Sequence, residues 1–151
     1  MHGLVQKLQS DNPTITLKEG TVFVWSPKKR QVTYIASKTK SDPWSLLHEV
    51  SHGLLDHTTY NSDIDLLQKE VEAWEKAVAL SHKYDVVIDR TFIENCLDSY
   101  RDWLHKRSIC PACRLQGIQK SLDMYSCINC ANTWNVTKER FCRPYRRLQQ
   151  K

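Results

Sequence analysis

The sequence of 151 residues contains no long apolar run. A membrane-spanning helix needs about 20 consecutive apolar residues, and no stretch of the chain approaches that length. Residues 1–10 also lack the apolar segment of a secretory signal peptide. Low-complexity segments and internal repeats are absent as well. These absences argue against a membrane protein, and we expect a soluble, cytoplasmic protein.

Acidic residues are scarce in the last third of the chain. Residues 101–151 contain 11 Lys and Arg but 3 Asp and Glu, whereas the first 100 residues contain 11 and 14. A basic segment of this kind suits an anionic partner, nucleic acid first, although a solvated basic tail fits equally well. The segment ends by interleaving aromatic residues with Arg140, Arg143, Arg146 and Arg147, a composition suited to phosphate contact and base stacking. We therefore expect these four arginines to contact nucleic acid.

Four of the six cysteines form two CxxC pairs, Cys110 with Cys113 and Cys127 with Cys130, separated by thirteen residues. This spacing is typical of a tetrahedral zinc site in a reducing compartment. Four thiolates leave no open coordination position, so the ion would be structural. We predict a zinc ribbon with a basic tail at residues 108–151, following a domain at residues 1–107.

An HExxH motif begins at His48 and ends at His52. On a helix these histidines lie one turn apart and can bind one metal ion. The apolar residues of the same stretch share the other side of the helix, which we predict at residues 43–57. Asp42 as N-cap and Pro43 in the first turn supply an independent start signal.

A second amphipathic helix is predicted at residues 63–84. Glu70 falls in the middle of its apolar arc, whereas Glu72 projects from the polar side. An unpaired carboxylate on a buried face is costly, so Glu70 needs a cation, and a zinc ion held by the two histidines supplies one. Glu72 and His57 are the alternative third ligands. On a continued first helix, however, His57 would point well away from both zinc histidines.

The ligand set His48, His52 and Glu70 leaves one position of a zinc ion for water, whose pKa falls to roughly 7 on the metal. Glu49 is the expected general base, because it points about 100° away from His48 and can reach that water without binding the metal. Asp56 could accept a hydrogen bond from the other ring nitrogen of His52, or it could be a solvated residue at the helix end.

The remaining segments complete an α+β fold with three main helices. We predict a small antiparallel sheet within residues 14–36, a short extended piece at residues 86–88 and a third helix at residues 90–106. Cys96 is expected in the core on the third helix. Cys142 is either a free thiol or a spare ligand, and the sequence does not decide between them.

Residues 48–57, followed by Glu-Val-Glu-Ala-Trp at residues 70–74, resemble the ImmA/IrrE-type metallopeptidases. These are compact gluzincins with HExxH-x-LL-x-H and then ExEAN, and the resemblance covers about residues 15–85. It implies that the first glutamate of the second motif, Glu70, is the zinc ligand. Trp74 stands where the family usually has Asn or Asp, a residue that normally supports the site.

The resemblance also implies how a substrate is held. Family members have an α+β fold whose sheet edge aligns an extended substrate beside the HExxH helix, and residues 32–36 are the candidate edge here. They act in bacteria and their mobile elements, several by cleaving transcriptional repressors. The attached zinc ribbon is similar to the tail of SprT-like proteases, which are associated with DNA-bound proteins. That likeness is weaker, because SprT-like enzymes use a third histidine.

We therefore predict a zinc-dependent endopeptidase that hydrolyses an extended segment of a protein, with two Zn²⁺ ions, one catalytic and one structural. The alternative is a non-catalytic, nucleic-acid-binding or regulatory zinc-ribbon protein that uses its gluzincin half as a scaffold. Tyr60, His82 and Tyr84 are the candidates for stabilising the oxyanion. The substrate and the oligomeric state are not determined by the sequence.

Overall fold

The computed structural model of the chain describes residues 1–36, 39–138 and 146–149. The chain divides into two compact units. Unit 1 consists of residues 1–59 and 69–93, and unit 2 consists of residues 60–68 and 94–151. The HExxH motif therefore belongs to unit 1 and the four paired cysteines belong to unit 2.

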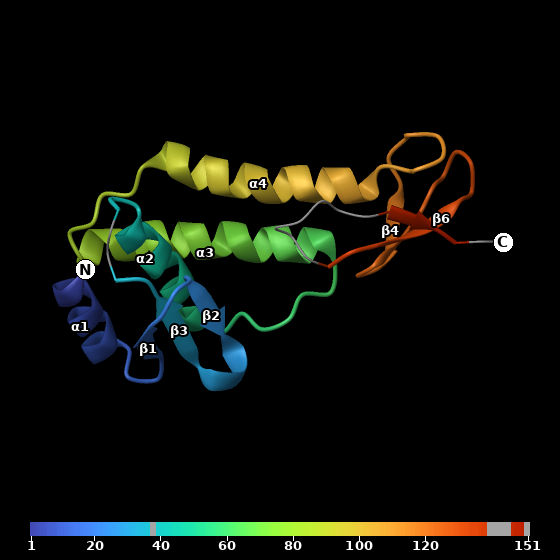
Figure 1. The fold of residues 1–151 in the computed structure, drawn as a ribbon. Coiled ribbons are helices and arrows are strands. Elements are labelled where there is room, and N and C mark those ends of the chain that lie inside the picture. Colours follow the sequence, from blue (N-terminus) through green and yellow to red (C-terminus); the bar gives the residue numbers. More distant parts are fainter. Residues whose placement is uncertain (37–38, 139–145, 150–151) are drawn as a thin grey trace. The chain divides into compact units, whose positions relative to one another are not determined.

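Unit 1 contains a three-stranded mixed sheet (Figure 1). Its strands are β1 (Thr16–Glu19), β2 (Val24–Ser26) and β3 (Gln31–Tyr34), in the spatial order β1-β3-β2. A short 3-10 turn at Pro27–Lys29 and the left-handed Arg30, with φ 45°, reverse the chain between β2 and β3. Strand β3 pairs antiparallel with β2 and parallel with β1.

Two expectations for this sheet are wrong. The sheet is mixed rather than antiparallel, because β1 and β2 run in opposite directions and β3 returns between them. The expected edge at residues 32–36 overlaps β3, which is the central strand, and its Val32 is fully buried at 0% exposure. Strand β2 forms an edge of the sheet instead.

Helix α1 (His2–Asp11) lies against β1, and helix α2 (Asp42–Leu54) lies against β2 and β3. Helix α1 was not predicted from the sequence, because it has one buried residue, Leu8, and hence a weak apolar period. Gly53 on α2 allows the sheet to approach closely. A Cβ atom there would lie 2.8 Å from Ile15 Cδ1 and 3.0 Å from the Trp25 ring.

Helices α3 (Asp63–Lys83) and α4 (Arg90–Ser108) begin where the sequence predicts and end within two residues of the predicted ends. Each helix contributes residues to both units. Residues 86–88 form no β-strand; they belong to the connection between the two helices. Within the described part of the chain, no helix has the length and apolar character needed to cross a membrane.

Unit 2 contains a four-stranded antiparallel sheet. Its strands follow one another in space as in sequence: β4 (Ile118–Ser121), β5 (Met124–Ser126), β6 (Thr133–Val136) and β7 (Arg146–Leu148). Tyr125 stacks on Trp134 with ring centroids 5.7 Å apart, and both side chains are buried. The helices and the two sheets make the α+β fold that the sequence predicts.

A buried polar network within unit 2 attaches this second sheet to two helix ends. Asp63, the first residue of α3, accepts hydrogen bonds from the Tyr125 hydroxyl and from Gln119 Nε2, the latter at 3.1 Å. Arg107 on the last turn of α4 lies 3.3 Å from the same carboxylate and also donates to the Leu122 carbonyl. Arg107 is 1% exposed, so this ion pair is removed from water.

Candidate active site

Helix α2 presents the HExxH histidines from a firmly packed position. Four of its apolar residues are buried, Trp44, Leu46, Leu47 and Val50, whereas Leu54 at its end is exposed. His48 and His52 are themselves only 7% and 9% exposed. The predicted start of this helix is correct to within one residue, and Pro43 lies in its first turn as expected. The predicted N-cap is wrong: the N-cap is Ser41, Asp42 is the first residue of the helix, and no side chain caps the helix with a hydrogen bond.

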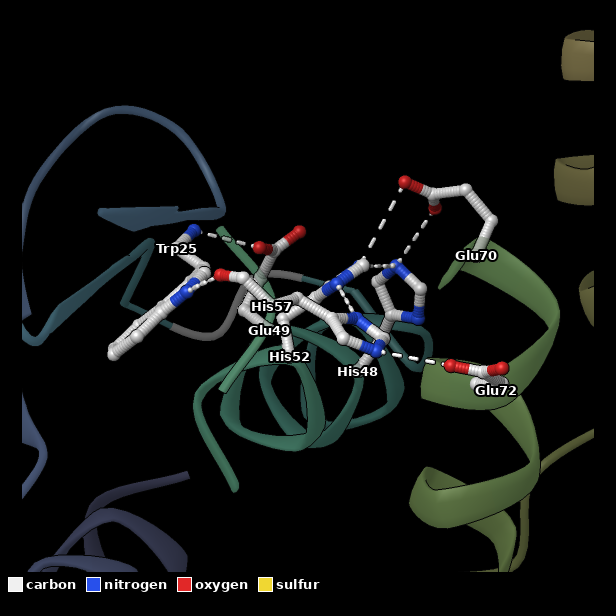
Figure 2. Close-up of polar contacts among 7 residues, drawn as sticks. All are labelled: Trp25, His48, Glu49, His52, His57, Glu70 and Glu72. Atoms are coloured by element: carbon white, nitrogen blue, oxygen red, sulfur yellow. Dashed lines mark hydrogen bonds and ion pairs between the residues drawn. The ribbon is translucent and has the colours of Figure 1, made fainter. Parts of the chain in front are cut away.

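Three side chains from α2 and α3 converge on one point (Figure 2). The Nε2 atoms of His48 and His52 lie 3.1 Å apart. The carboxylate of Glu70 lies 3.2 Å from His48 Nε2 and 3.7 Å from His52 Nε2. A tetrahedral zinc ion with ligand bonds of about 2.0–2.1 Å holds its ligand atoms roughly 3.3 Å apart. The donor set and its spacing therefore fit a zinc ion.

Glu70 is buried at 6% exposure, and its charge depends on the two histidines. Burial alone would raise the pKa of Glu70, but hydrogen bonds with His48 and His52 lower that pKa well below its usual range. The carboxylate is thus held in the ionised form that a metal ligand requires. This placement agrees with the prediction that Glu70, rather than Glu72 or His57, is the third ligand.

Glu49 points to the edge strand of the sheet. The backbone N–H of Trp25 on β2 donates to Glu49 Oε2 at 2.7 Å (Figure 2). This hydrogen bond holds one carboxylate oxygen and leaves Oε1 available to take a proton. Because Trp25 belongs to β2, the expected general base lies directly beside the free edge of the sheet.

Helix α2 ends earlier than predicted, at Leu54 instead of residue 57. Asp56 adopts the left-handed conformation with φ 55°, and the His57 N–H donates back to the His52 carbonyl at 3.0 Å. The Asp56 N–H donates to the Gly53 carbonyl at 3.3 Å. This pair of hydrogen bonds is the Schellman arrangement that closes many helices. It returns His57 over the last turn of α2.

His57, which was not expected to be a ligand, lies behind His52. Its Nδ1 atom is 2.9 Å from His52 Nδ1, and its Nε2 atom is 3.2 Å from Glu72 Oε2. Burial lowers the pKa of His57, and the neighbouring His52 lowers it further against the opposing effect of Glu72. The lowered pKa favours the neutral form of His57 near pH 7, and His57 does not belong to the group formed by His48, His52 and Glu70.

Asp56 does not hold His52, contrary to one of the two expectations for it. Its carboxylate instead accepts a hydrogen bond from Arg30 at 2.8 Å, and both side chains are largely exposed. The reason is the left-handed turn, which directs Asp56 away from the helix axis and gives its expected place to His57.

Trp74 occupies the position that usually carries Asn or Asp in the ImmA/IrrE-type motif. Its ring stacks on His48, with centroids 4.2 Å apart and planes inclined by 24°. The Nδ1 atom of His48 is buried and has no hydrogen-bond partner in the described part of the chain. The His48 ring is thus oriented by stacking, whereas His52 is oriented by a hydrogen-bonding partner.

The four paired cysteines form a second candidate metal site, in unit 2. Cys110 Sγ lies 3.7 Å from Cys130 Sγ, and Cys113 Sγ lies 3.4 Å from Cys127 Sγ. Zinc–sulfur bonds of about 2.3 Å in a tetrahedron place sulfurs roughly 3.8 Å apart, so the cluster fits zinc and is too open for disulfides.

The two CxxC loops of this cluster repeat one backbone turn. Arg114 and Ala131 follow the second cysteine of each pair, and both are left-handed, with φ 63° and φ 57°. Each donates its N–H to the carbonyl of the first cysteine, at 2.9 Å and 3.1 Å. The Asn132 side chain and backbone amide lower the pKa of Cys130 to about 6, which favours the thiolate that zinc binds.

The three residues proposed to stabilise the oxyanion are not part of the histidine cluster. His82 follows Glu70 by 12 residues, roughly 18 Å along α3, and the Tyr84 hydroxyl donates to Asp11 at 2.9 Å. Neither His82 nor Tyr84 reaches the site, and the role of Tyr60, a residue of unit 2, stays a prediction. Cys96 is half-buried on α4.

The basic tail is only partly described. Arg146 and Arg147 are exposed on β7, and Arg146 donates to the Ile109 carbonyl at 3.0 Å. Arg140, Arg143 and Cys142 lie outside the described residues. The proposed arginine contacts with nucleic acid therefore stay a prediction.

Trp25 was not predicted from the sequence as a site residue, and Glu72 was considered only as an alternative metal ligand. Trp25 donates from its backbone to Glu49 and from its indole Nε1 to the His57 carbonyl at 2.8 Å. Nothing in a short strand pattern indicates such a position. For Glu72 a signal existed, because it lies two residues after Glu70 and follows the glutamate pattern of the ImmA/IrrE-type motif.

Comparison with known proteins identifies no relative: no family model, curated protein or solved structure matches the chain. The interpretation of the site therefore depends on its geometry. That geometry provides two candidate metal sites, one with two histidines and a glutamate and one with four cysteines. The first is consistent with a zinc peptidase.

Proposed function

We propose that the chain is a zinc-dependent endopeptidase that hydrolyses an extended segment of a protein. The observation that carries this proposal is the convergence of His48, His52 and Glu70, with Glu49 directed to the neighbouring sheet edge. A structural metal site normally has four protein ligands, whereas three ligands leave a position for water or substrate. A nearby carboxylate outside the ligand set is the further group that hydrolysis needs.

Zinc bound there would polarise the scissile carbonyl and lower the pKa of a bound water to roughly 7. The protein's own contribution is made by Glu49. Its Oε2 atom is held by the Trp25 N–H, so Oε1 accepts the proton of the attacking water and then delivers it to the leaving amine. His48, His52 and Glu70 act as ligands and take no proton.

The substrate is expected to lie along β2. This strand is an edge of the sheet, and its Trp25 backbone contacts the general base. A peptide that adds to the edge in extended form places one of its carbonyls next to Glu49. Val22 and Val24 are 52% and 44% exposed beside this edge and offer apolar contacts to alternate side chains of the peptide.

The motif resemblance supports the same activity. Residues 48–57 and 70–74 are similar to the HExxH and ExEAN motifs of ImmA/IrrE-type peptidases, and Glu70 occupies the expected ligand position. The substrate class that follows is a transcriptional repressor or another DNA-bound protein. A reducing, cytoplasmic location fits this proposal, since the described cysteines form no disulfide.

The test is the change Glu49→Gln. It removes the proton acceptor while keeping shape, so turnover of a cleaved protein should fall about 100–10,000-fold with both zinc ions retained. Cleavage products are quantified by mass spectrometry, and bound zinc by elemental analysis. Glu75→Gln serves as the control. Glu75 is an exposed residue of α3, so this change should leave turnover unaltered.

Equal cleavage by wild type and Glu49→Gln would refute the peptidase. The second candidate function would then stand: a regulatory or nucleic-acid-binding zinc-ribbon protein with the histidine site as a structural element. The observation that favours this second function is that β7 contains two arginines and that all three of its residues are exposed.

A further inference from the structure

A chain of three side chains leads away from the metal-facing atom of His52 (Figure 2). His52 Nε2 faces His48 and Glu70, so its Nδ1 atom is the one directed outward. That Nδ1 lies 2.9 Å from His57 Nδ1. At the other side of the same ring, His57 Nε2 lies 3.2 Å from Glu72 Oε2.

The order of donors and acceptors in this chain is dictated by its last member. A carboxylate only accepts hydrogen bonds, so the proton between His57 and Glu72 belongs to His57 Nε2. A neutral imidazole carries one ring proton, which leaves His57 Nδ1 as an acceptor. The proton between the two histidines then belongs to His52 Nδ1. His52 Nε2 is consequently left with its lone pair, the state in which an imidazole binds a metal.

We propose that His57 and Glu72 are positioning residues that fix the tautomer and ring orientation of His52. This inference rests on the proposed metal site and adds two residues that act through a ligand without touching the metal. It assigns a role to the second glutamate of the Glu70–Glu72 pair, whose side chain is 58% exposed and would otherwise be a solvated surface group.

His57 is held in place independently of its ring. Its N–H donates to the His52 carbonyl at 3.0 Å, and its carbonyl accepts from the Trp25 indole at 2.8 Å. The residue is 8% exposed. Both backbone groups and both ring nitrogens therefore have partners, which is the arrangement expected of a residue that orients another. Because the backbone N–H of Trp25 also donates to Glu49, this one residue of the edge strand contacts both the general base and the residue behind His52.

The two histidines of the HExxH motif differ in what lies behind them. His48 has no corresponding chain, since its Nδ1 has no partner among the described residues and its ring stacks on Trp74. Of the two metal-facing histidines, His52 alone is given a defined tautomer by a carboxylate in the described structure.

The experiment uses the full chain in the inactive Glu49→Gln form, with the ribbon first loaded by one equivalent of zinc. Affinity for the second equivalent is measured by competition with a chromophoric chelator. Glu72→Ala should weaken this affinity roughly 10–100-fold, as expected for a partner behind a ligand, and Glu70→Gln should weaken it more. Glu72→Gln keeps an acceptor oxygen and should restore most of the loss. Glu75→Ala, on the exposed side of the same helix, should stay within about twofold of the parent.

A spectroscopic measurement separates positioning from a general charge effect. Heteronuclear NMR of the imidazole nitrogens should show protonated Nδ1 on His52 and protonated Nε2 on His57 before the second zinc ion is added. Glu72→Ala should convert both rings to tautomer mixtures. The opposite tautomer of His57, or an affinity loss in Glu72→Ala no larger than in Glu75→Ala, would overturn the proposal.

These readouts do not depend on peptide hydrolysis. If the predicted tautomers and affinities are observed and no protein is ever cleaved, the positioning role stands and the peptidase does not. If Glu70→Gln also leaves zinc affinity unaltered, the metal site is wrong and the positioning role is overturned with it.

Discussion

The two histidines of the candidate metal site are oriented by different kinds of contact. His52 has a hydrogen-bonding neighbour, whereas His48 has an aromatic face against it, 4.2 Å away. Trp74 is 4% exposed and packs edge-on against Phe92 at 5.8 Å, so its ring is fixed from both sides. A fixed ring restricts the rotation of the imidazole that it covers. Trp74 can therefore replace part of what a hydrogen-bonding Asn or Asp would do.

We expect Trp74→Phe to keep zinc affinity and Trp74→Leu to lower it. Stacked aromatic pairs contribute about 0.5–1.5 kcal/mol beyond area burial, which corresponds to roughly 2–13-fold in affinity for the second zinc equivalent. Both changes leave space in the core, so both should lower the free energy of unfolding by a similar amount, below the about 3–5 kcal/mol typical of Trp→Ala. Chelator competition and urea unfolding are the measurements. Equal zinc affinity of the two variants would show that stacking does not hold His48.

At the scale of elements, the end of α2 decides which residue lies behind the metal site. A helix continued to residue 57 would carry His57 away from the ligands, but the left-handed Asp56 stops the helix and reverses the chain. The Arg30–Asp56 ion pair is exposed and contributes at most about 1 kcal/mol. The backbone conformation at Asp56 is thus the important feature of this residue.

The change Asp56→Val should destabilise the protein by about 1–2 kcal/mol, because a β-branched residue is strained in the left-handed region. Asp56→Gly should be close to neutral. Asp85 is a matched control, since it is also left-handed, with φ 54°, and follows α3. Asp85→Val should lower the free energy of unfolding by a similar amount without lowering the affinity for the second zinc equivalent. Asp56→Val should lower both the free energy of unfolding and that affinity. Similar zinc affinity of the two valine variants would argue against the role of the turn.

At the scale of the whole molecule, each unit has its own means of stability. Unit 1 buries apolar residues between α2 and the sheet. Unit 2 has a small core around Tyr125 and Trp134, with the cysteine cluster and the Asp63–Arg107 ion pair beside it. Small modules of this kind depend on metal or polar attachment, because their apolar core is limited.

Removing one partner of the buried ion pair should be costly. Arg107→Met leaves the Asp63 charge without its cation and should lower the free energy of unfolding by about 3–5 kcal/mol. Adding Asp63→Asn should recover part of that loss, since no uncompensated charge remains. Urea unfolding of the zinc-loaded chain provides the values, with Arg101→Met, in an exposed pair with Glu94 and Asp98, as a near-neutral control. Additive losses in the double variant would mean that the two charges are not coupled.

Nucleic-acid binding through the arginines of the basic tail predicts an affinity that depends on salt concentration. If Arg140, Arg143, Arg146 and Arg147 contact phosphates, changing all four to serine should reduce the slope of log affinity against log salt by about 0.9 for each duplex contact. Binding of the full chain to single- and double-stranded DNA and to RNA is titrated with salt. A control variant changes four exposed lysines of unit 1 to serine: Lys7, Lys18, Lys28 and Lys29. The prediction fails if the arginine variant binds as tightly as the wild type.

Local sequence patterns determined the parts of the site that lie within single elements. The spacing of His48 and His52, the position of Glu70 on an apolar arc and the two CxxC pairs all follow from the periods of a helix and a short loop. The start of α2 follows from its first-turn proline, Pro43. These features need no knowledge of distant contacts, and for that reason they were predicted correctly.

Tertiary structure alone decided the contacts between elements. The Trp25–Glu49 hydrogen bond joins residues 24 apart in the sequence, and the His57–Glu72 contact joins residues 15 apart. The first depends on β3 inserting between β1 and β2, which makes β2 an edge, and the second depends on the left-handed turn at Asp56. Strand order and a single left-handed residue have almost no periodic signal. Their consequences appear only when the packed chain brings the segments together.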